Sequence, residues 1–140
     1  MDLKILWMYN DLMDLYGDKG NIQVLKTRAL KRNINVTVKT CSLNEEVDIN
    51  DYDLFFLGGG ADYEQNLIFE DLLKRKDSIV NALNHSTTFL LICGGYQLFG
   101  KYYLDQDGNE IDVVRHPKQI VQIKLEKEVF KNDLIRRKIV

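Results

Sequence analysis

The residues best suited to chemistry in this sequence are Cys93 and the two glycines that follow it. A short apolar run of strand type, residues 89–92, leads into Cys93, and a short amphipathic pattern of helical type comes after the glycines. A strand that turns sharply into a helix lifts the side chain at the turn out of the sheet. The helix N-terminus then favours the nucleophilic thiolate. We therefore predict a nucleophile elbow with Cys93 as the catalytic residue; the alternative is a buried structural cysteine.

A second candidate is Gly58-Gly-Gly60, which ends another apolar run at residues 54–57. A phosphate loop would need a lysine or a later glycine, and residues 61–64 supply neither. An oxyanion hole fits better, because glycine N–H groups can turn toward a substrate and stabilise a tetrahedral intermediate. A tight strand-to-helix turn is the plainer alternative.

Other chemistries lack the residues they require. His85 and His116 are the only histidines and no Cys/His cluster forms, so we expect neither a metal nor a cofactor. Cys41 and Cys93 are far apart and form no C-x-x-C pair, which favours reduced thiols and a packing role for Cys41. A phospho-receiver domain would need an aspartate where Gly58 ends the third strand. A flavodoxin would need a phosphate loop where residues 10–16 are bulky and acidic.

The elements that must position these residues alternate between strand and helix. This alternation predicts an α/β fold with a doubly wound, mostly parallel sheet of flavodoxin-like type. Ligands of such sheets bind at the carboxyl ends of the strands, where both glycine turns fall, so we expect one shared crevice. The predicted strands are residues 3–9, 35–43, 54–57 and 87–92, and the predicted helical segments are 21–32 and 62–84.

Periodicity predicts which helical residues face inward, and turn residues predict a hairpin after the elbow. Residues 101–104 and 109–111 flank an Asp-Gly turn and are expected to pair as two short strands. The predicted inward positions are Ile22, Leu25, Ala29 and Leu30 in the first helix and Leu67, Ile68, Leu72, Leu73, Ile79, Val80 and Leu83 in the second segment.

Composition limits the class of protein. The chain has 140 residues, of which 45% are hydrophobic and 29% charged, enough for one domain with a core. No apolar run is long enough to span a bilayer and the N-terminus lacks the features of a signal peptide. We therefore expect a cytoplasmic protein without direct membrane insertion.

The charge distribution changes near residue 113. Residues 1–112 carry 11 basic and 18 acidic side chains, a net charge of −7, whereas residues 113–140 carry 8 and 3, a net charge of +5. No aromatic or RNA-binding motif accompanies the basic tail, so a solvated helix is favoured and no nucleic-acid partner is expected. The sequence predicts a main unit of residues 1–112 and a divergent tail of residues 113–140, with a strand at 119–125 and a helix at 126–138.

Three stretches, residues 14–22, 56–65 and 91–103, together carry a resemblance to a known family. Cys93-Gly-Gly-Tyr-Gln97 resembles the C-x-G-x-Q nucleophile motif of class I glutamine amidotransferases. The three stretches together resemble the CobB/CobQ-like branch, and within it the glutaminase subunits of lipid II isoglutaminyl synthases. The resemblance covers roughly residues 2–112.

The resemblance implies a glutaminase. Cys93 would attack the side-chain amide of L-glutamine and release ammonia, leaving a thioester that water hydrolyses. The N–H groups of Gly94, Gly59 and Gly60 would hold the oxyanion, and Gln97 would help to position the substrate. The ammonia would pass to a MurT-like ATP-dependent ligase subunit that amidates the peptidoglycan precursor lipid II, so that this partner, and not this chain, would bind ATP.

The sequence departs from the family pattern after residue 112. The family activates its cysteine with a histidine that comes much later in a longer chain, and residues 113–118 replace an expected Gly-Leu-Gly-type strand. We therefore expect a truncated or frame-shifted product with a fold incomplete on its C-terminal side. Neither His116, held extended before Pro117, nor His85, at the opposite end of the sheet, is placed by the sequence within reach of Cys93.

This departure leaves two alternatives open. One is a catalytically inactive module that binds glutamine or a partner without turnover. The other is an elbow-cysteine protein of the PfpI type, which would need a glutamate on an early loop where Asp11 and Asp14 stand.

Overall fold

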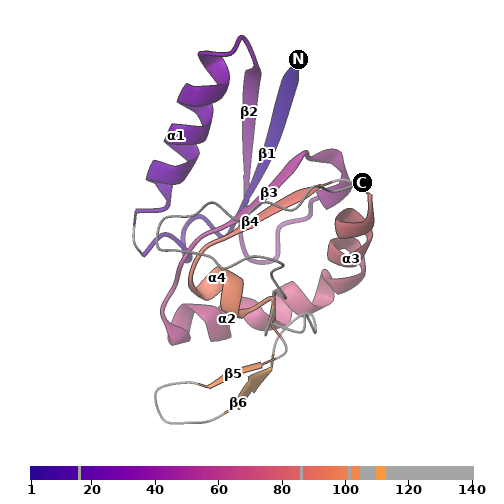
Figure 1. The fold of residues 1–140 in the computed structure, drawn as a ribbon. Helices are drawn as coiled ribbons and strands as arrows, with labels where there is room; N and C mark the ends of the chain where they lie inside the picture. The colour runs from indigo at the N-terminus through magenta and orange to yellow at the C-terminus, as the bar shows by residue number, and fades with distance from the viewer. Residues whose placement is uncertain (16, 86, 101, 105–109, 113–140) are drawn as a thin grey trace, which may run out of the picture.

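A four-stranded parallel sheet forms the centre of the molecule (Figure 1). The computed structural model describes the chain except residues 16, 86, 101, 105–109 and 113–140. The strand order is β2-β1-β3-β4, which confirms the predicted α/β fold with a parallel sheet. The strands are β1 (Asp2–Met8), β2 (Asn35–Cys41), β3 (Leu54–Leu57) and β4 (Thr88–Leu91).

Helices cover both faces of the sheet (Figure 1). Strand residues alternate between the two faces, so Leu6 and Phe55 pack on one side and Trp7 and Phe56 on the other. Both faces are therefore apolar, as strands of a covered parallel sheet require. The face of Trp7 carries α1 (Lys19–Leu30), and the face of Leu6 carries the 3-10 turn η1 (Ile49–Asp51), α2 (Asp62–Lys74) and α3 (Lys76–Asn84).

The helices bury narrower stripes than their periodicity predicts. In α1, Ile22 and Ala29 are buried, but Leu30 is 58% exposed, because the helix ends there and the chain leaves through Asn33, whose φ is +56°. In the second segment, Leu67 and Leu73 are exposed and correct the prediction. Each is next in sequence to a buried residue, and one residue turns an α-helix by about 100°. The buried apolar residues of this segment are Ile68, Leu72, Ile79 and Ala82.

The predicted hairpin is present as β5 (Tyr102–Leu104) and β6 (Glu110–Asp112), which pair antiparallel. It extends away from the parallel sheet, beyond α2 (Figure 1). Its turn and the predicted elements at 119–125 and 126–138 lie outside the described residues. Among the helices that the structure describes, none combines the length and apolar character needed to cross a membrane.

Candidate active site

The candidate site lies at the carboxyl edge of the sheet, where the segments after β1, β3 and β4 meet. The chain passes from β1 outward to β2 and then crosses back over β1 to reach β3. The order of strands therefore reverses between β1 and β3, and such a switch point is where doubly wound sheets bind ligands. Gly58-Gly-Gly60 follows β3 and Cys93 follows β4 by two residues.

Cys93 occupies a strained turn between β4 and the short helix α4 (Gly94–Gln97). Its φ is +47° and its ψ is −113°, outside the regions that residues with a Cβ favour. Such a conformation costs about 1–3 kcal/mol and persists only where surrounding structure holds it in place. The side chain is exposed, so its sulfur is accessible. Leu98 and Phe99 are buried just after α4, and the Phe99 ring packs 5.9 Å from Phe55 and from Phe89, which fixes the elbow to the sheet.

The two glycine turns are in direct contact. The N–H of Gly95 donates to Gly58 O at 3.2 Å. A Cβ on Gly95 would lie 2.7 Å from Gly58 O, and one on Gly94 would lie 2.7 Å from Gly60 O. Any side chain at Gly94 or Gly95 would therefore separate the elbow from the turn after β3. The glycines are required for close backbone approach.

Some of these glycine N–H groups already donate a hydrogen bond within the protein, and others do not. Gly95 donates to Gly58 O and Ile92 O, and Gly59 donates to the carboxylate of Asp18 at 2.8 Å. Within the described part of the chain, the N–H groups of Gly60 and Gly94 donate to no other group. Of the three N–H groups predicted to hold the oxyanion, that of Gly59 is thus already engaged. The N–H groups of Gly60 and Gly94 remain candidates.

A buried glutamine, Gln65, which was not predicted from the sequence, connects the two glycine turns. Gln65 is 2% exposed, and its Nε2 donates to Gly60 O at 3.1 Å and to Gln97 Oε1 at 3.4 Å. Because Gln97 presents its oxygen to Gln65, its own amide nitrogen remains available as a donor. No described group pairs with the Oε1 of Gln65. Gln65 closes the stretch 56–65, and a polar residue one turn into a helix after a glycine run was the available signal.

Asp18 is a second residue of the site that was not predicted from the sequence. This carboxylate is 2% exposed and comes from the loop after β1, although it contacts the turn after β3. Its position between Gly17 and Gly20, in a loop at the carboxyl edge, was the available signal. Asp11 and Asp14, the acidic residues considered on this loop from the sequence, have other partners: Asp11 accepts a hydrogen bond from the Ser42 hydroxyl and Asp14 from the N–H of Lys19.

His85, the one histidine in the described part of the chain, is not placed as a base for Cys93. His85 follows α3 and precedes β4, so the whole of β4 separates it from Cys93, at about 3.3 Å per residue. Its Nδ1 lies 2.8 Å from Asn81 O. His116 lies outside the described residues. In the described ranges no group of three or more His, Cys, Asp or Glu side chains could hold a metal ion.

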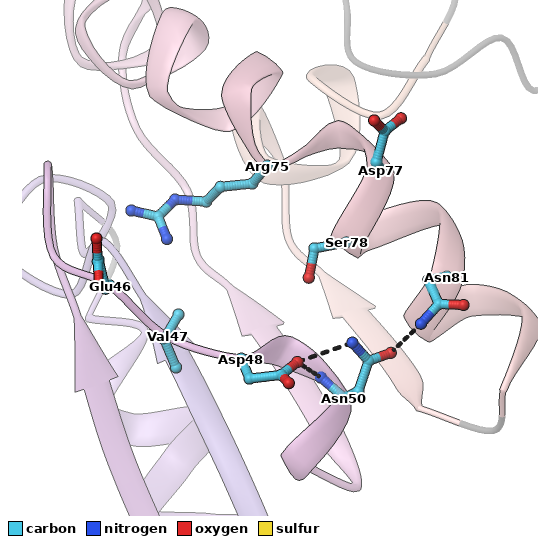
Figure 2. A pocket seen from close by; sticks show the side chains of 8 residues that line it. All are labelled: Glu46, Val47, Asp48, Asn50, Arg75, Asp77, Ser78 and Asn81. Carbon is cyan, nitrogen blue, oxygen red and sulfur yellow. Dashed lines mark hydrogen bonds between the residues drawn. The ribbon is translucent and has the colours of Figure 1, made fainter.

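An open cavity of ≈ 780 Å³ lies away from the elbow, between the segment before β3 and α3 (Figure 2). Neither Cys93 nor the glycine turns line it. Asn50 bridges its two sides, accepting from Asn81 at 2.9 Å and donating to Asp48 at 2.8 Å (Figure 2). The lining residues are Glu46, Val47, Asp48, Asn50, Arg75, Asp77, Ser78 and Asn81.

Arg75 in this cavity is part of a structural network. Its Nε donates to Asp71 at 2.8 Å, and Asp71 also accepts from the buried Tyr9 hydroxyl at 2.6 Å. Burial alone would raise the pKa of Asp71, but the hydrogen bonds from Arg75 and Tyr9 outweigh it and hold that pKa below its usual value. Burial, reinforced by Asp71, raises the pKa of Tyr9. The network ties the end of α2 to Tyr9, the residue after β1, and pairs the charge of Arg75 with that of Asp71.

The fold and site define an α/β protein with an exposed cysteine on a strained strand-to-helix turn, beside a glycine-rich turn. Residues 4–126 match the CobB/CobQ-like glutamine amidotransferase domain, so the chain belongs to this family. The expected resemblance is confirmed.

The chain is also similar to two named proteins. The chain is 46% identical over 110 residues to the GatD subunit of the glutamine-hydrolysing lipid II isoglutaminyl synthase of Streptococcus pneumoniae, covering 79% of this chain and 42% of that protein. It is 41% identical over 111 residues to the corresponding GatD subunit of Staphylococcus aureus, covering 79% of this chain and 46% of that protein. The chain thus spans less than half the length of either relative.

Proposed function

We propose that this chain is the nucleophile-bearing part of a glutaminase, in which Cys93 attacks the side-chain amide of L-glutamine. The observation that carries the proposal is the exposed, strained Cys93 beside the unused N–H groups of Gly60 and Gly94. Preorganised N–H donors beside a nucleophile stabilise the oxyanion of acyl transfer, and removing one such donor typically costs about 10²–10³ in rate. Membership of the glutamine amidotransferase family supports the same chemistry.

In the proposed reaction, the Cys93 sulfur forms a bond to the amide carbon and the carbonyl oxygen becomes an oxyanion. The N–H groups of Gly60 and Gly94 bind that oxyanion. The C–N bond then breaks, the nitrogen takes up the proton that the thiol has lost and leaves as ammonia, and a glutamyl thioester remains. Water hydrolyses the thioester to glutamate and restores the thiol. Gln97, held through its oxygen by Gln65, donates its amide N–H to the substrate.

We further propose that the ammonia passes to a MurT-like ATP-dependent ligase subunit for amidation of lipid II. The names of the two relatives, both subunits of glutamine-hydrolysing lipid II isoglutaminyl synthases, support this role. The ligase would bind ATP and lipid II, and the parts of the relatives beyond their match to this chain would correspond to the rest of the glutaminase.

The test uses a glutamine-analogue electrophile. Wild-type protein incubated with 6-diazo-5-oxo-L-norleucine is expected to carry one adduct at Cys93, located by peptide mass spectrometry. Cys41→Ala should be labelled equally and serves as the matched control, whereas Cys93→Ala should not be labelled. Glutamate release is then measured with and without a MurT-like partner, and the partner is expected to raise it.

The outcomes separate the glutaminase from the inactive alternative. Labelling of Cys93 without glutamate release under either condition would favour a module that binds glutamine without turnover. The separation of His85 from Cys93 by the whole of β4 also favours such a module. Absence of any adduct at Cys93 would reject the role of this cysteine as an activated nucleophile.

A further inference from the structure

The loop after β1 forms hydrogen bonds with both the N–H and the carbonyl of Gly59, the middle glycine of the turn after β3. The N–H of Gly59 donates to Asp18 Oδ2 at 2.8 Å, and the carbonyl of Gly59 accepts from the N–H of Leu15 at 3.1 Å. The glycine run belongs to one strand–helix unit and the loop to another, so these contacts are not needed to close either turn locally.

Asp18 makes this contact instead of capping its own helix. It directly precedes α1, where an aspartate side chain normally accepts a hydrogen bond from the first turn. Here the side chain forms no such cap. Its Oδ2 binds Gly59, and its Oδ1 accepts from Asn21 Nδ2 at 3.1 Å. A nearly fully buried carboxylate that gives up its local cap forms a short, charge-assisted bond to a distant turn.

Gly58 makes room for this carboxylate. A Cβ at Gly58 would lie 2.8 Å from Asp18 Oδ2 and 2.9 Å from its Cγ. The glycine run and Asp18 therefore fit together as one structure. The stretch 14–22, which the nucleophile chemistry does not otherwise use, supplies both the carboxylate and the Leu15 N–H.

The two hydrogen bonds to Gly59 determine the direction of the Gly60 N–H group. The Gly59–Gly60 peptide is trans, so its carbonyl and its N–H point in opposite directions. Since the carbonyl points to Leu15 in the loop after β1, the Gly60 N–H points away from that loop. The following Gly60 carbonyl lies against Gly94 and Gln65 at the elbow.

We propose that Asp18 is a positioning residue that holds the Gly59–Gly60 peptide so that the Gly60 N–H faces the oxyanion formed beside Cys93. The proposal rests on the proposed function. Asp18 touches no substrate and acts through Gly59. Its removal should impair steps that form an oxyanion and spare reactions of the Cys93 sulfur that form none.

Two reagents on the full 140-residue protein separate these steps. Iodoacetamide alkylates Cys93 by displacement: an S–C bond forms, iodide leaves, and no carbonyl oxygen becomes charged. L-Glutamic acid γ-(4-nitroanilide) acylates Cys93: the S–C bond forms through an oxyanion, the C–N bond breaks, and 4-nitroaniline leaves with a proton. The burst of 4-nitroaniline reports acylation, and intact-protein mass spectrometry reports alkylation.

The variants include a matched control from the same loop. Asp14 also accepts a hydrogen bond from a backbone N–H, that of Lys19 at 2.8 Å, but in the described part of the chain its side chain has no hydrogen bond to Gly59. We expect Asp18→Ala to slow acylation about 10²-fold, mainly in the burst rate constant and not in KM, with alkylation unchanged. Asp14→Ala should match wild type in both. Asp18→Asn, which keeps an acceptor oxygen, should lie between them. Far-UV circular dichroism verifies that each variant folds.

Selective ¹⁵N-glycine labelling gives a readout independent of catalysis, since the chain has only nine glycines. In wild type the Gly59 amide should exchange slowly with solvent and the Gly60 amide quickly. Asp18→Ala should speed Gly59 exchange and shift the Gly60 resonance, and Asp14→Ala should do neither.

The outcomes are distinct. Equal loss of acylation and alkylation in Asp18→Ala, or unchanged acylation, would overturn the positioning role. Wild-type protein that is alkylated but never acylated would contradict the proposed function instead. In that case an unchanged Gly60 resonance in Asp18→Ala would also overturn the positioning role, whereas a shifted one would support it.

Discussion

The two cysteines of this chain stand at the same edge of one sheet and have opposite environments. Cys41 is the last residue of β2, is 1% exposed, and its sulfur lies 3.6 Å from Glu45 O. Cys93 lies two residues beyond β4, is exposed, and has a positive φ. A cysteine that continues the strand geometry packs into the core, whereas one placed on a turn followed by two glycines faces solvent. The local backbone, and not the residue type, decides which cysteine is exposed.

The largest expected difference between them is the rate of alkylation. In native protein, iodoacetamide should modify Cys93 about 10³-fold faster than Cys41, because reaction at a buried thiol requires local opening that costs about 4 kcal/mol. The measurement is the rate of adduct formation at each cysteine by peptide mass spectrometry. In 6 M guanidinium chloride the two rates should converge, and a difference that persisted there would show that the fold is not its cause.

The glycines after Cys93 should be the next most sensitive feature. Gly95→Ala would place a Cβ against Gly58 O and Leu57 O, and such overpacking should lower the free energy of unfolding by about 3 kcal/mol. Gly20 in α1 has no atom within 4 Å of its would-be Cβ, so Gly20→Ala should raise stability by about 0.5–1 kcal/mol. Urea denaturation of both variants measures the contrast. Equal effects would mean that the elbow is not held by close backbone contact.

Replacing each cysteine by glycine should change stability in opposite directions. Cys93→Gly relieves the positive φ and should stabilise the protein by about 1 kcal/mol, after allowing for the added entropy of glycine in the unfolded chain. Cys41→Gly leaves a cavity in the core and should destabilise it by about 2 kcal/mol. Denaturant midpoints of the two variants measure the sign of each stability change. Destabilisation by Cys93→Gly would contradict the strain at the elbow.

The smallest effect is expected in the pH dependence of stability. Burial raises the pKa of the Cys41 thiol. A raised folded-state pKa contributes stability that is fully present below the unfolded value, about 8.5, and is lost as pH rises through the folded value. Unfolding free energy should therefore begin to fall above about pH 8.5. In Cys41→Ala the unfolding free energy should no longer fall between about pH 8.5 and about pH 10, where tyrosines begin to ionise. In the control, Cys93→Ala, the fall over this pH range should remain.

Sequence patterns predicted the strands and the contrast between the cysteines because both depend on neighbouring residues. The apolar run 54–57 and the paired glycines after Cys93 are local signals, and the structure has a strand and a turn at these positions. Leu30 and Leu67 were predicted to face inward from helical periodicity, but their exposure depends on how much of each helix the sheet covers. That width is a property of the packed fold.

The contacts of the candidate site could not be predicted in the same way. Asp18 and Gln65 stand in polar stretches where solvent exposure is the ordinary expectation, and each is buried only because another segment packs over it. Asp18 bonds to Gly59, and Gln65 bonds to Gly60 and Gln97. These partners lie up to 41 positions away in the sequence. No local pattern encodes such pairs. The sequence identified the glycine backbones as possible donors but not which N–H groups are already bonded.

The hydrogen bond between Asp18 and Gly59, together with the contact between Gly60 and Gly94, has a consequence for folding order. These residues come from three separate βα units, and none of the pairs forms within a single unit. Closing such long loops is slow compared with forming the helices. During synthesis, the loop after β1 can form its hydrogen bonds with the turn after β3 before β4 exists. The turn at Cys93 cannot pack against Gly60 until about residue 99 has left the ribosome. Cys93 is therefore positioned only after the turn against which its own turn packs.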